Sequence, residues 1–260
     1  MTYEIVAVRY GTLLSHKSEL FYRYQAYGEP DASQDMDFFF YILRNGDEVT
    51  VVDTGFRPAA ALPRGRECLT APAQALERLG VDPARVSRLV ITHMHWDHIG
   101  NVELFDSAEL FVPAVELDFW ASPVARSEQI WAHTDHEGVE MLESARRDGR
   151  VLETGAEHEI APGLRTITVG GHSPGQQILV VATAGGPVVL ASDAVHLYEE
   201  LELERPFAVM VNLPEMYEAY ALLNRLRSEG ASIVPGHDPL VTCRYPDLGG
   251  DVAGLAFQIA

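Results

Sequence analysis

The chain is poor in cysteine and in basic residues, and it has no long apolar run. Its two cysteines, Cys68 and Cys243, lie far apart and match no metal-ligand spacing, so we expect reduced thiols in a cytoplasmic protein. Lys and Arg number 19 against 38 Asp and Glu, a net charge of −19 that argues against nucleic acid as a partner. We expect no membrane partner and no secretory signal, because no segment has the required apolar pattern.

What the chain does contain is typical of a globular protein. It has 260 residues, of which 47% are hydrophobic and 22% charged, and no linker-like stretch interrupts it. This length suffices for a substantial core. We therefore expect residues 1–260 to form a single domain that acts on a small molecule.

The segment Thr92–His98 concentrates metal-ligating groups. It holds His93, His95, Asp97 and His98 directly after a short apolar segment that reads as a buried strand. Two histidines two residues apart can point the same way, while the residues of the following turn can face a neighbouring point. The spacing therefore predicts two adjacent metal positions. Imidazole and carboxylate ligands suit zinc, iron, manganese or cobalt, and the lack of nearby thiolates disfavours a closed structural zinc site.

Alternating strand and helix patterns predict an α/β fold of packed sheets with helices on their outer faces. The Asn45-Gly46 pair predicts a hairpin between two of the strands. Strands are expected at 3–10, 38–43, 48–52, 87–92, 108–113, 164–169, 177–183, 187–191 and 232–234, and helices at 71–79, 135–147 and 217–228.

A long insertion at about 13–37 separates the first strand from this hairpin. It carries four aromatic residues: Phe21, Tyr22, Tyr24 and Tyr27. Long loops in compact domains are often functional, so these rings are candidates for binding substrate. Two other interpretations stay open: the rings close over the core, or they form the contact of a homodimer.

Three further ligand-type residues stand beside small residues at expected strand ends. They are His172, Asp193 and His237. Small neighbours let the backbone turn sharply and approach a metal closely. Together with the histidine cluster, these residues complete a ligand set.

In this order of motifs, from Val52-Asp53-Thr54-Gly55 through HxHxDH to His237, the chain resembles the metallo-β-lactamase superfamily. The resemblance implies an αββα sandwich with two divalent metal ions, zinc first among them, at one edge. By resemblance, His93, His95 and His172 hold one metal, Asp97, His98 and His237 hold the second, and Asp193 bridges both. Asp53 is expected to orient ligand histidines.

Among its members, the chain is most similar to the quorum-quenching N-acyl-homoserine lactonases in length, insertion and short tail. That likeness implies a lactone ring opened by a hydroxide shared between two metals, with Asp97 carrying the proton to the leaving alkoxide. Those lactonases commonly place a tyrosine where His196 stands, so we expect His196 to contact the substrate carbonyl. A role for His196 away from the substrate stays open. Gln176 stands at a position where many relatives have a second histidine.

Three alternative hypotheses stay open. In the first, the substrate is another small cyclic ester or amide, such as an aromatic lactone. In the second, the protein is an iron-dependent redox member of the same superfamily, although flavodiiron relatives usually carry Glu where His95 stands. In the third, the protein is a metal-binding scaffold without activity, which the complete ligand set disfavours.

Overall fold

Two β-sheets packed face to face form the centre of the molecule, and the computed structural model describes all residues, 1–260. The first sheet has eight strands in the order β13-β1-β2-β3-β5-β6-β7, with β4 paired to β1. Its strands are β1 (Glu4–Leu13), β2 (Met36–Asn45), β3 (Glu48–Val52), β4 (Glu67–Cys68), β5 (Arg88–Val90), β6 (Glu109–Pro113), β7 (Val151–Thr154) and β13 (Ala256–Gln258).

The second sheet has five strands in the order β12-β11-β10-β9-β8. They are β8 (Glu157–Ala161), β9 (Leu164–Thr168), β10 (Gln177–Thr183), β11 (Gly186–Ser192) and β12 (Ser232–Pro235). Each sheet contains parallel neighbours, β3, β5, β6 and β7 in the first and β11 with β12 in the second. The carboxyl ends of parallel strands lie at the same edge of their sheet, which is where loops carrying function gather.

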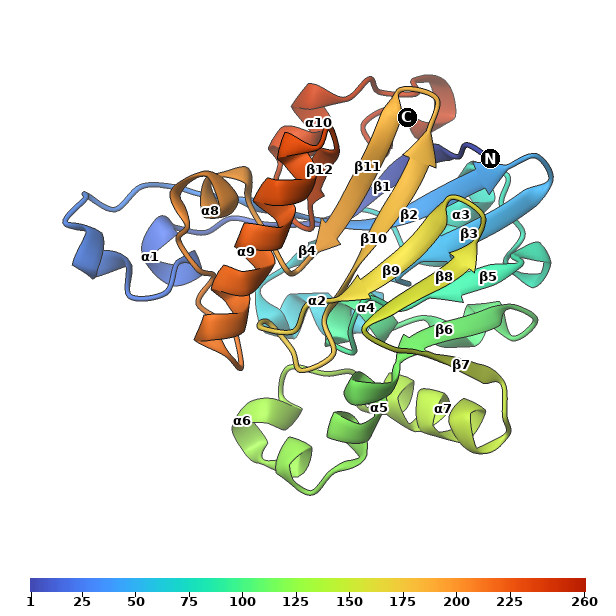
Figure 1. The fold of residues 1–260 in the computed structure, drawn as a ribbon, viewed down its shortest axis with the longest axis horizontal. Helices are drawn as coiled ribbons and strands as arrows, with labels where there is room; N and C mark the ends of the chain where they lie inside the picture. The colour runs from blue at the N-terminus through green and yellow to red at the C-terminus, as the bar shows by residue number, and fades with distance from the viewer.

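Helices cover the outer face of each sheet. They are α1 (Lys17–Leu20), α2 (Pro58–Ala61), α3 (Pro72–Arg78), α4 (Trp96–Ile99), α5 (Ala114–Ala121), α6 (Glu128–Trp131), α7 (His136–Arg147), α8 (Tyr198–Leu203), α9 (Leu213–Ser228) and α10 (Leu240–Arg244). Figure 1 shows α9 lying across the second sheet, with α5, α6 and α7 gathered beside β6 and β7 of the first. None of the helices combines the length and apolar composition needed to cross a membrane.

Alternation along the strands produces this layering. In β1, Ile5 and Ala7 point into the core between the sheets, whereas Val6 and Val8 point into the core beneath the outer helices. Successive side chains of a strand point to opposite faces of the sheet, so both sets are apolar when both faces are covered. The αββα sandwich expected from the sequence is therefore confirmed. That the whole chain is one domain stays a prediction.

The expected elements are present with shifted ends, and the structure adds elements that the sequence analysis did not expect, among them β4, β7, β8, β13, α5, α6 and α8. Helix α9 begins at Leu213, four residues before the expected start, because Asn212 caps it and Pro214 suits the first turn. The insertion at 13–37 contains the short helix α1 and a 3₁₀ turn at Tyr24–Tyr27, and it projects beside α8 (Figure 1).

Candidate metal centre

The ends of several strands deliver the ligand-type side chains to one edge of the sandwich. The histidine cluster follows β5, with His93 and His95 on the loop and Asp97 and His98 in the one-turn helix α4. His172, Asp193 and His237 follow β9, β11 and β12. Gly236 is needed before His237, since a Cβ there would lie 2.7 Å from the Ser192 carbonyl oxygen. The structure thus brings together all seven residues proposed as ligands.

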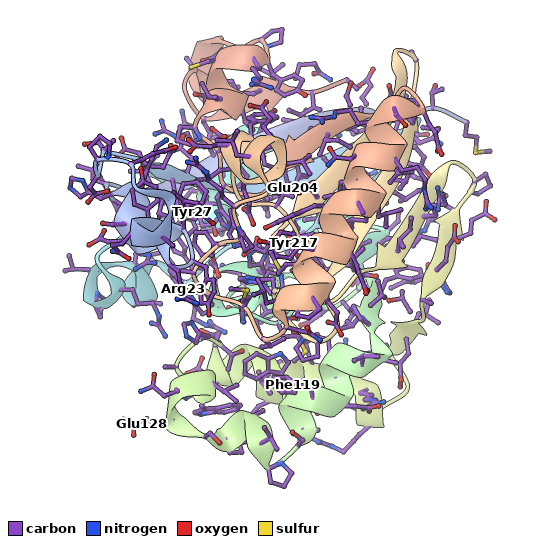
Figure 2. All side chains as sticks on the ribbon, turned by 60° about the vertical axis from the view of Figure 1, so that its left-hand side comes forward. Arg23, Tyr27, Phe119, Glu128, Glu204 and Tyr217 are labelled. Atoms are coloured by element: carbon purple, nitrogen blue, oxygen red, sulfur yellow. The ribbon has the colours of Figure 1, made fainter.

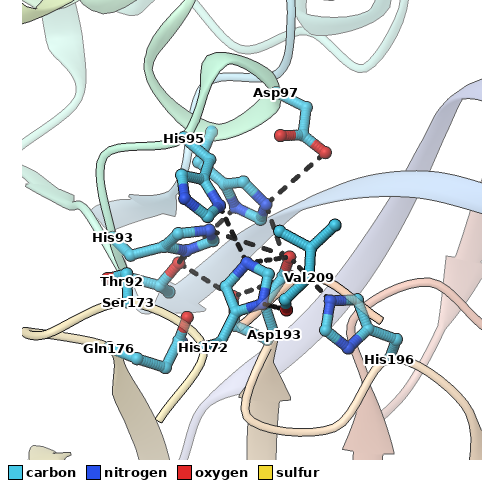
Figure 3. Close-up of polar contacts among 12 residues, drawn as sticks. Thr92, His93, His95, Asp97, His172, Ser173, Gln176, Asp193, His196 and Val209 are labelled. Carbon is cyan, nitrogen blue, oxygen red and sulfur yellow. Dashed lines mark hydrogen bonds and ion pairs between the residues drawn. The ribbon is translucent and has the colours of Figure 1, made fainter. Parts of the chain in front are cut away.

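One group of donor atoms comprises His93, His95, His172 and Asp193, all of them buried. Nε2 of His172 lies 2.8 Å from Nδ1 of His95 and 3.3 Å from Oδ2 of Asp193. Nε2 of His93 lies 3.7 Å from the same carboxylate oxygen. Figure 3 shows these rings converging around Asp193. We call these three histidines the triple-histidine group.

A second group comprises Asp97, His98 and His237, also buried. Oδ2 of Asp97 lies 3.7 Å from Nε2 of His98 and 3.8 Å from Nε2 of His237. Both imidazoles also approach Oδ1 of Asp193, at 3.4 Å and 3.1 Å. We call these three residues the mixed group. Asp193 therefore presents one oxygen to each group.

The donor set fits divalent metal ions. Nε2 of His93 and Nε2 of His98 are buried and have no hydrogen-bond partner. Leaving buried polar atoms unpaired is costly, so an occupant that accepts nitrogen lone pairs would resolve both. Within each group the donor atoms lie within 4.8 Å of one another. Imidazole and carboxylate donors without a nearby thiolate suit zinc, iron, manganese or cobalt.

Hydrogen bonds at the opposite ring nitrogens orient the histidines. His172 Nδ1 contacts the Val209 carbonyl at 2.8 Å, and His237 Nδ1 contacts the Asp37 carbonyl at 2.9 Å. His98 Nδ1 lies 2.8 Å from Oδ2 of Asp53, whose carboxylate also accepts from the Thr92 amide and hydroxyl. Such partners fix the ring and its tautomer. Asp53 occupies the position expected of an orienting residue.

The surroundings shift the pKa values of the histidines in opposite directions in the two groups. Burial lowers the pKa values of His93 and His95 well below the usual range and lowers that of His172 to about 3. For His98 burial acts in the same direction, but the carboxylates of Asp193, Asp53 and Asp97 outweigh it and raise the pKa well above its usual value. Burial thus favours neutral imidazoles in the triple-histidine group, whereas the carboxylates favour the protonated form of His98.

His196 lies in the same site. Its Nε2 is 3.2 Å from Oδ2 of Asp193, its Nδ1 is 3.2 Å from Oε2 of Glu200, and its ring stacks on Phe207 at 3.7 Å. Burial lowers its pKa, but Asp193 and Glu200 raise it to about 9. Glu200 also accepts hydrogen bonds from the His196 amide and the Tyr220 hydroxyl, which holds the ring in one orientation.

Glu116 of α5 is a site residue that the sequence did not indicate. It is fully buried, and its carboxylate accepts from the Met94 amide (2.9 Å), the Ser173 hydroxyl (2.6 Å) and the Gly175 amide (2.8 Å). It thereby links the loop of His93 and His95 to the turn that carries His172. A charged residue on the buried face of an apolar helix is the one local signal of such a role.

The aromatic insertion lies outside this centre. Phe21 and Tyr24 are buried in a small core with Leu197 and Phe207, while Tyr22 and Tyr27 are 38% and 36% exposed. None of the four lines the cavity at the metal ligands, because the rings turn into their own cluster or outward. Figure 2 shows Tyr27 on the insertion, away from Phe119 of α5. Substrate contact and a homodimer through this insertion both stay predictions.

Two adjoining cavities open at the ligands. The first, about 90 Å³, is lined by residues of both groups together with Met36, Phe38, Arg66, Trp96, His133, His196, Phe207 and Val209. The second, about 260 Å³, shares His95, His133, His172 and Val209 with the first. Its other walls include Phe119, Trp120, Ile130 and Met210, so it is an apolar chamber beside the triple-histidine group.

Comparison with known proteins identifies relatives across most of the chain. The family model described as the metallo-beta-lactamase superfamily matches residues 39–237. An N-acyl homoserine lactonase from Bacillus sp. is 25% identical over 224 residues, which span 80% of this chain and 84% of the relative. Metallo-beta-lactamase domain-containing protein 1 from Xenopus laevis is 30% identical over 198 residues, 76% of this chain and 69% of the relative. The crystal structure of a quorum-quenching N-acyl homoserine lactone lactonase matches with a TM-score of 0.76 at 21% identity, covering 95% of this chain and 97% of that one.

Proposed function

The chain belongs to the metallo-beta-lactamase superfamily, and from this premise we propose that it is a metal-dependent hydrolase that opens lactone rings. The observation that carries the proposal is the Asp193 carboxylate, with one oxygen facing the triple-histidine group and the other facing the mixed group. A carboxylate placed in this way suits two adjacent metal ions. N-acyl-homoserine lactones are the first substrates to test, since the Bacillus sp. relative bears that activity in its name.

Two metal ions held by these residues would supply a water of lowered pKa and would polarise the substrate carbonyl. His93, His95 and His172 would hold the first, Asp97, His98 and His237 the second, and Asp193 both. Zinc is the first choice, and iron, manganese and cobalt suit the same ligands.

Asp97 is our candidate for carrying a proton to the leaving alkoxide. It lines the cavity at the ligands, and its backbone carbonyl accepts a 2.8 Å hydrogen bond from the buried Tyr10 hydroxyl, which holds its position. His196 is our candidate donor to the substrate carbonyl, because its imidazole lines the same cavity beside Asp193. Positioned donors of this kind stabilise developing negative charge.

The cavities suit a small ester with an apolar arm. The chamber bounded by Phe119, Ile130 and Met210 opens beside His95 and His172, where an acyl chain could lie while its lactone ring faces the metals. Burial of apolar surface contributes roughly 25 cal/mol per Å². An aromatic or other small cyclic ester would fit the same chamber and is the second candidate substrate.

The decisive experiment is metal analysis followed by a lactone panel monitored by acid release. We expect metal-dependent hydrolysis of N-acyl-homoserine lactones with short and long chains. In Asp97→Asn protein that retains both metals by elemental analysis, kcat should fall by at least about a hundredfold with little change in lactone binding, as expected for a lost proton carrier. Hydrolysis of no lactone by metal-loaded protein would refute the proposal, and tightly bound iron with oxygen uptake would favour a redox protein.

A further inference from the structure

Arg66 places a cation in the cavity beside the mixed group. It lies between Gly65, which takes a positive φ of 71°, and β4, whose residues Glu67 and Cys68 pair with β1. This pairing fixes the backbone next to Arg66. The side chain then forms part of the cavity wall together with Asp97, His133 and His237.

One hydrogen-bond donor of this guanidinium is buried without a partner. One terminal nitrogen donates to the Arg64 carbonyl, but Nε is buried and has no partner. Arg66 forms no ion pair within 4.0 Å, in a chain with 38 acidic and 19 basic residues. Burial lowers its pKa, and the attraction of Asp97 opposes that shift. Arginine stays charged in proteins, so the cavity wall holds a cation that no carboxylate contacts directly.

Trp96 lies beside this cation and beside a second one, Arg64. The Arg64 guanidinium lies 4.8 Å from the centre of the Trp96 ring, and that ring stacks on Phe56 at 5.0 Å. The Arg66 guanidinium is 5.9 Å from the same ring. Cation–π contacts of this kind hold guanidinium groups in place. Two positive charges thus meet beside a metal centre in a protein whose net charge is −19.

We propose that Arg66 binds a carboxylate on the substrate, so that this enzyme prefers lactones with an anionic substituent. The inference rests on the proposed lactone hydrolysis and narrows its substrate class. An overall charge of −19 repels anions, and a local cation in the cavity wall offsets that repulsion for an anionic substrate. A guanidinium fork matches a carboxylate in geometry, and a carboxylate is small enough for a cavity of about 90 Å³.

The test compares two lactones that differ in charge alone: γ-butyrolactone with a carboxylate on the ring carbon next to the ring oxygen, and the matching carboxamide. For the metal-loaded wild type we expect kcat/KM to favour the carboxylate by about ten- to a hundredfold, the range of a charge-assisted hydrogen bond. Arg66→Gln should bring this ratio close to one, mainly through KM. Arg66→Lys, which keeps the charge but not the fork, should give an intermediate ratio.

Arg85→Gln is the matched control, because Arg85 is exposed and does not line the cavity. Its ratio should equal that of the wild type. Circular dichroism and metal content should agree among all variants that are compared. If Arg66→Gln fails to fold, the Arg66→Lys ratio decides. Equal kcat/KM for both lactones in the wild type, or an unchanged ratio in a folded Arg66 variant, would overturn the inference while leaving lactone hydrolysis intact.

A binding measurement separates this inference from the proposed function. Calorimetric titration with glutarate and with butyrate compares a dicarboxylate with a monocarboxylate, and neither compound is hydrolysed. We expect glutarate to bind the metal-loaded wild type about tenfold more tightly than butyrate, and Arg66→Gln to remove the difference. Failure to hydrolyse any lactone, the N-acyl-homoserine lactones included, would reject the proposed function, while the glutarate preference would still decide the role of Arg66.

Discussion

The triple-histidine group and the mixed group share Asp193 but differ in how their surroundings shift histidine pKa values. His93, His95 and His172 have lowered pKa values, which favour the neutral imidazole that binds a metal. His98 of the mixed group has a raised pKa and must lose a proton before it can bind a metal. One fold therefore builds two adjacent sites from similar residues with different proton requirements.

The surroundings of the two groups differ as well. The triple-histidine group adjoins the apolar chamber of Phe119 and Met210, whereas Arg66 shares the smaller cavity with Asp97 of the mixed group. A substrate spanning the centre would thus meet an apolar wall on one side and a cation on the other. This asymmetry favours a substrate with two chemically different ends.

The largest effect should follow from removing what the groups share. Asp193→Asn takes the carboxylate charge from both, so we expect metal content to fall from two ions per chain and kcat/KM to fall by more than about a hundredfold. Metal content and lactone turnover measure this. Two retained metals with normal turnover would show that Asp193 does not join the groups.

A change at Asp53 should affect the mixed group more strongly than the triple-histidine group. Asp53→Asn removes the carboxylate 2.8 Å from Nδ1 of His98, and loss of such a partner typically weakens metal binding about 10- to 100-fold. Asp53 reaches His93 only through Thr92, so competition with a chelator should show one metal weakened clearly more than the other. Equal weakening of both would contradict the separation of the groups.

Metal binding should depend on pH in the mixed group and not in the triple-histidine group. Because the pKa of His98 is raised in the folded protein, protons compete with metal below that pKa, and affinity should fall about tenfold per pH unit as pH decreases. The lowered pKa values of His93, His95 and His172 leave the other group indifferent to pH near neutrality. Calorimetry in buffers of different ionisation enthalpy would count the released protons. Equal proton release on metal binding at the triple-histidine group and at the mixed group would contradict the assignment.

The smallest effect should come from Glu116, which touches no metal ligand side chain. Glu116→Gln replaces a carboxylate oxygen that accepts from backbone amides near His93, His95 and His172. We expect the metal affinity of the triple-histidine group to fall by about fivefold to tenfold, a small effect because Glu116 acts indirectly. The same chelator competition as for Asp53→Asn measures which metal loses affinity. Weaker metal binding at the mixed group would contradict the role of Glu116.

That the candidate ligand side chains meet at one centre could be predicted, because each stands at a strand end in a local pattern. His93, His95, Asp97 and His98 are dense in the sequence, and Gly236 marks the turn before His237. Most strands and the helices α3, α7 and α9 were likewise predictable from periodicity, although the start of α9 depended on the Asn212 cap. The shorter helices, α5 among them, were not predicted.

Residues that act through tertiary contacts could not be predicted in this way. Glu116 and Glu200 meet their partners only after packing, and nothing in their sequence neighbourhoods names those partners. Arg66 became visible only when the pairing of β4 with β1 placed it in the cavity. The aromatic residues of the insertion had the composition of a binding surface, but their packing depended on Leu197 and Phe207, far along the chain.

The most direct test of the two-group centre is the metal stoichiometry of reconstituted protein, measured by elemental analysis beside a His237→Ala variant. The account predicts two ions per chain in the wild type and one in the variant, since His237 belongs to the mixed group alone. A single ion in the wild type, or the loss of both ions in the variant, would contradict it.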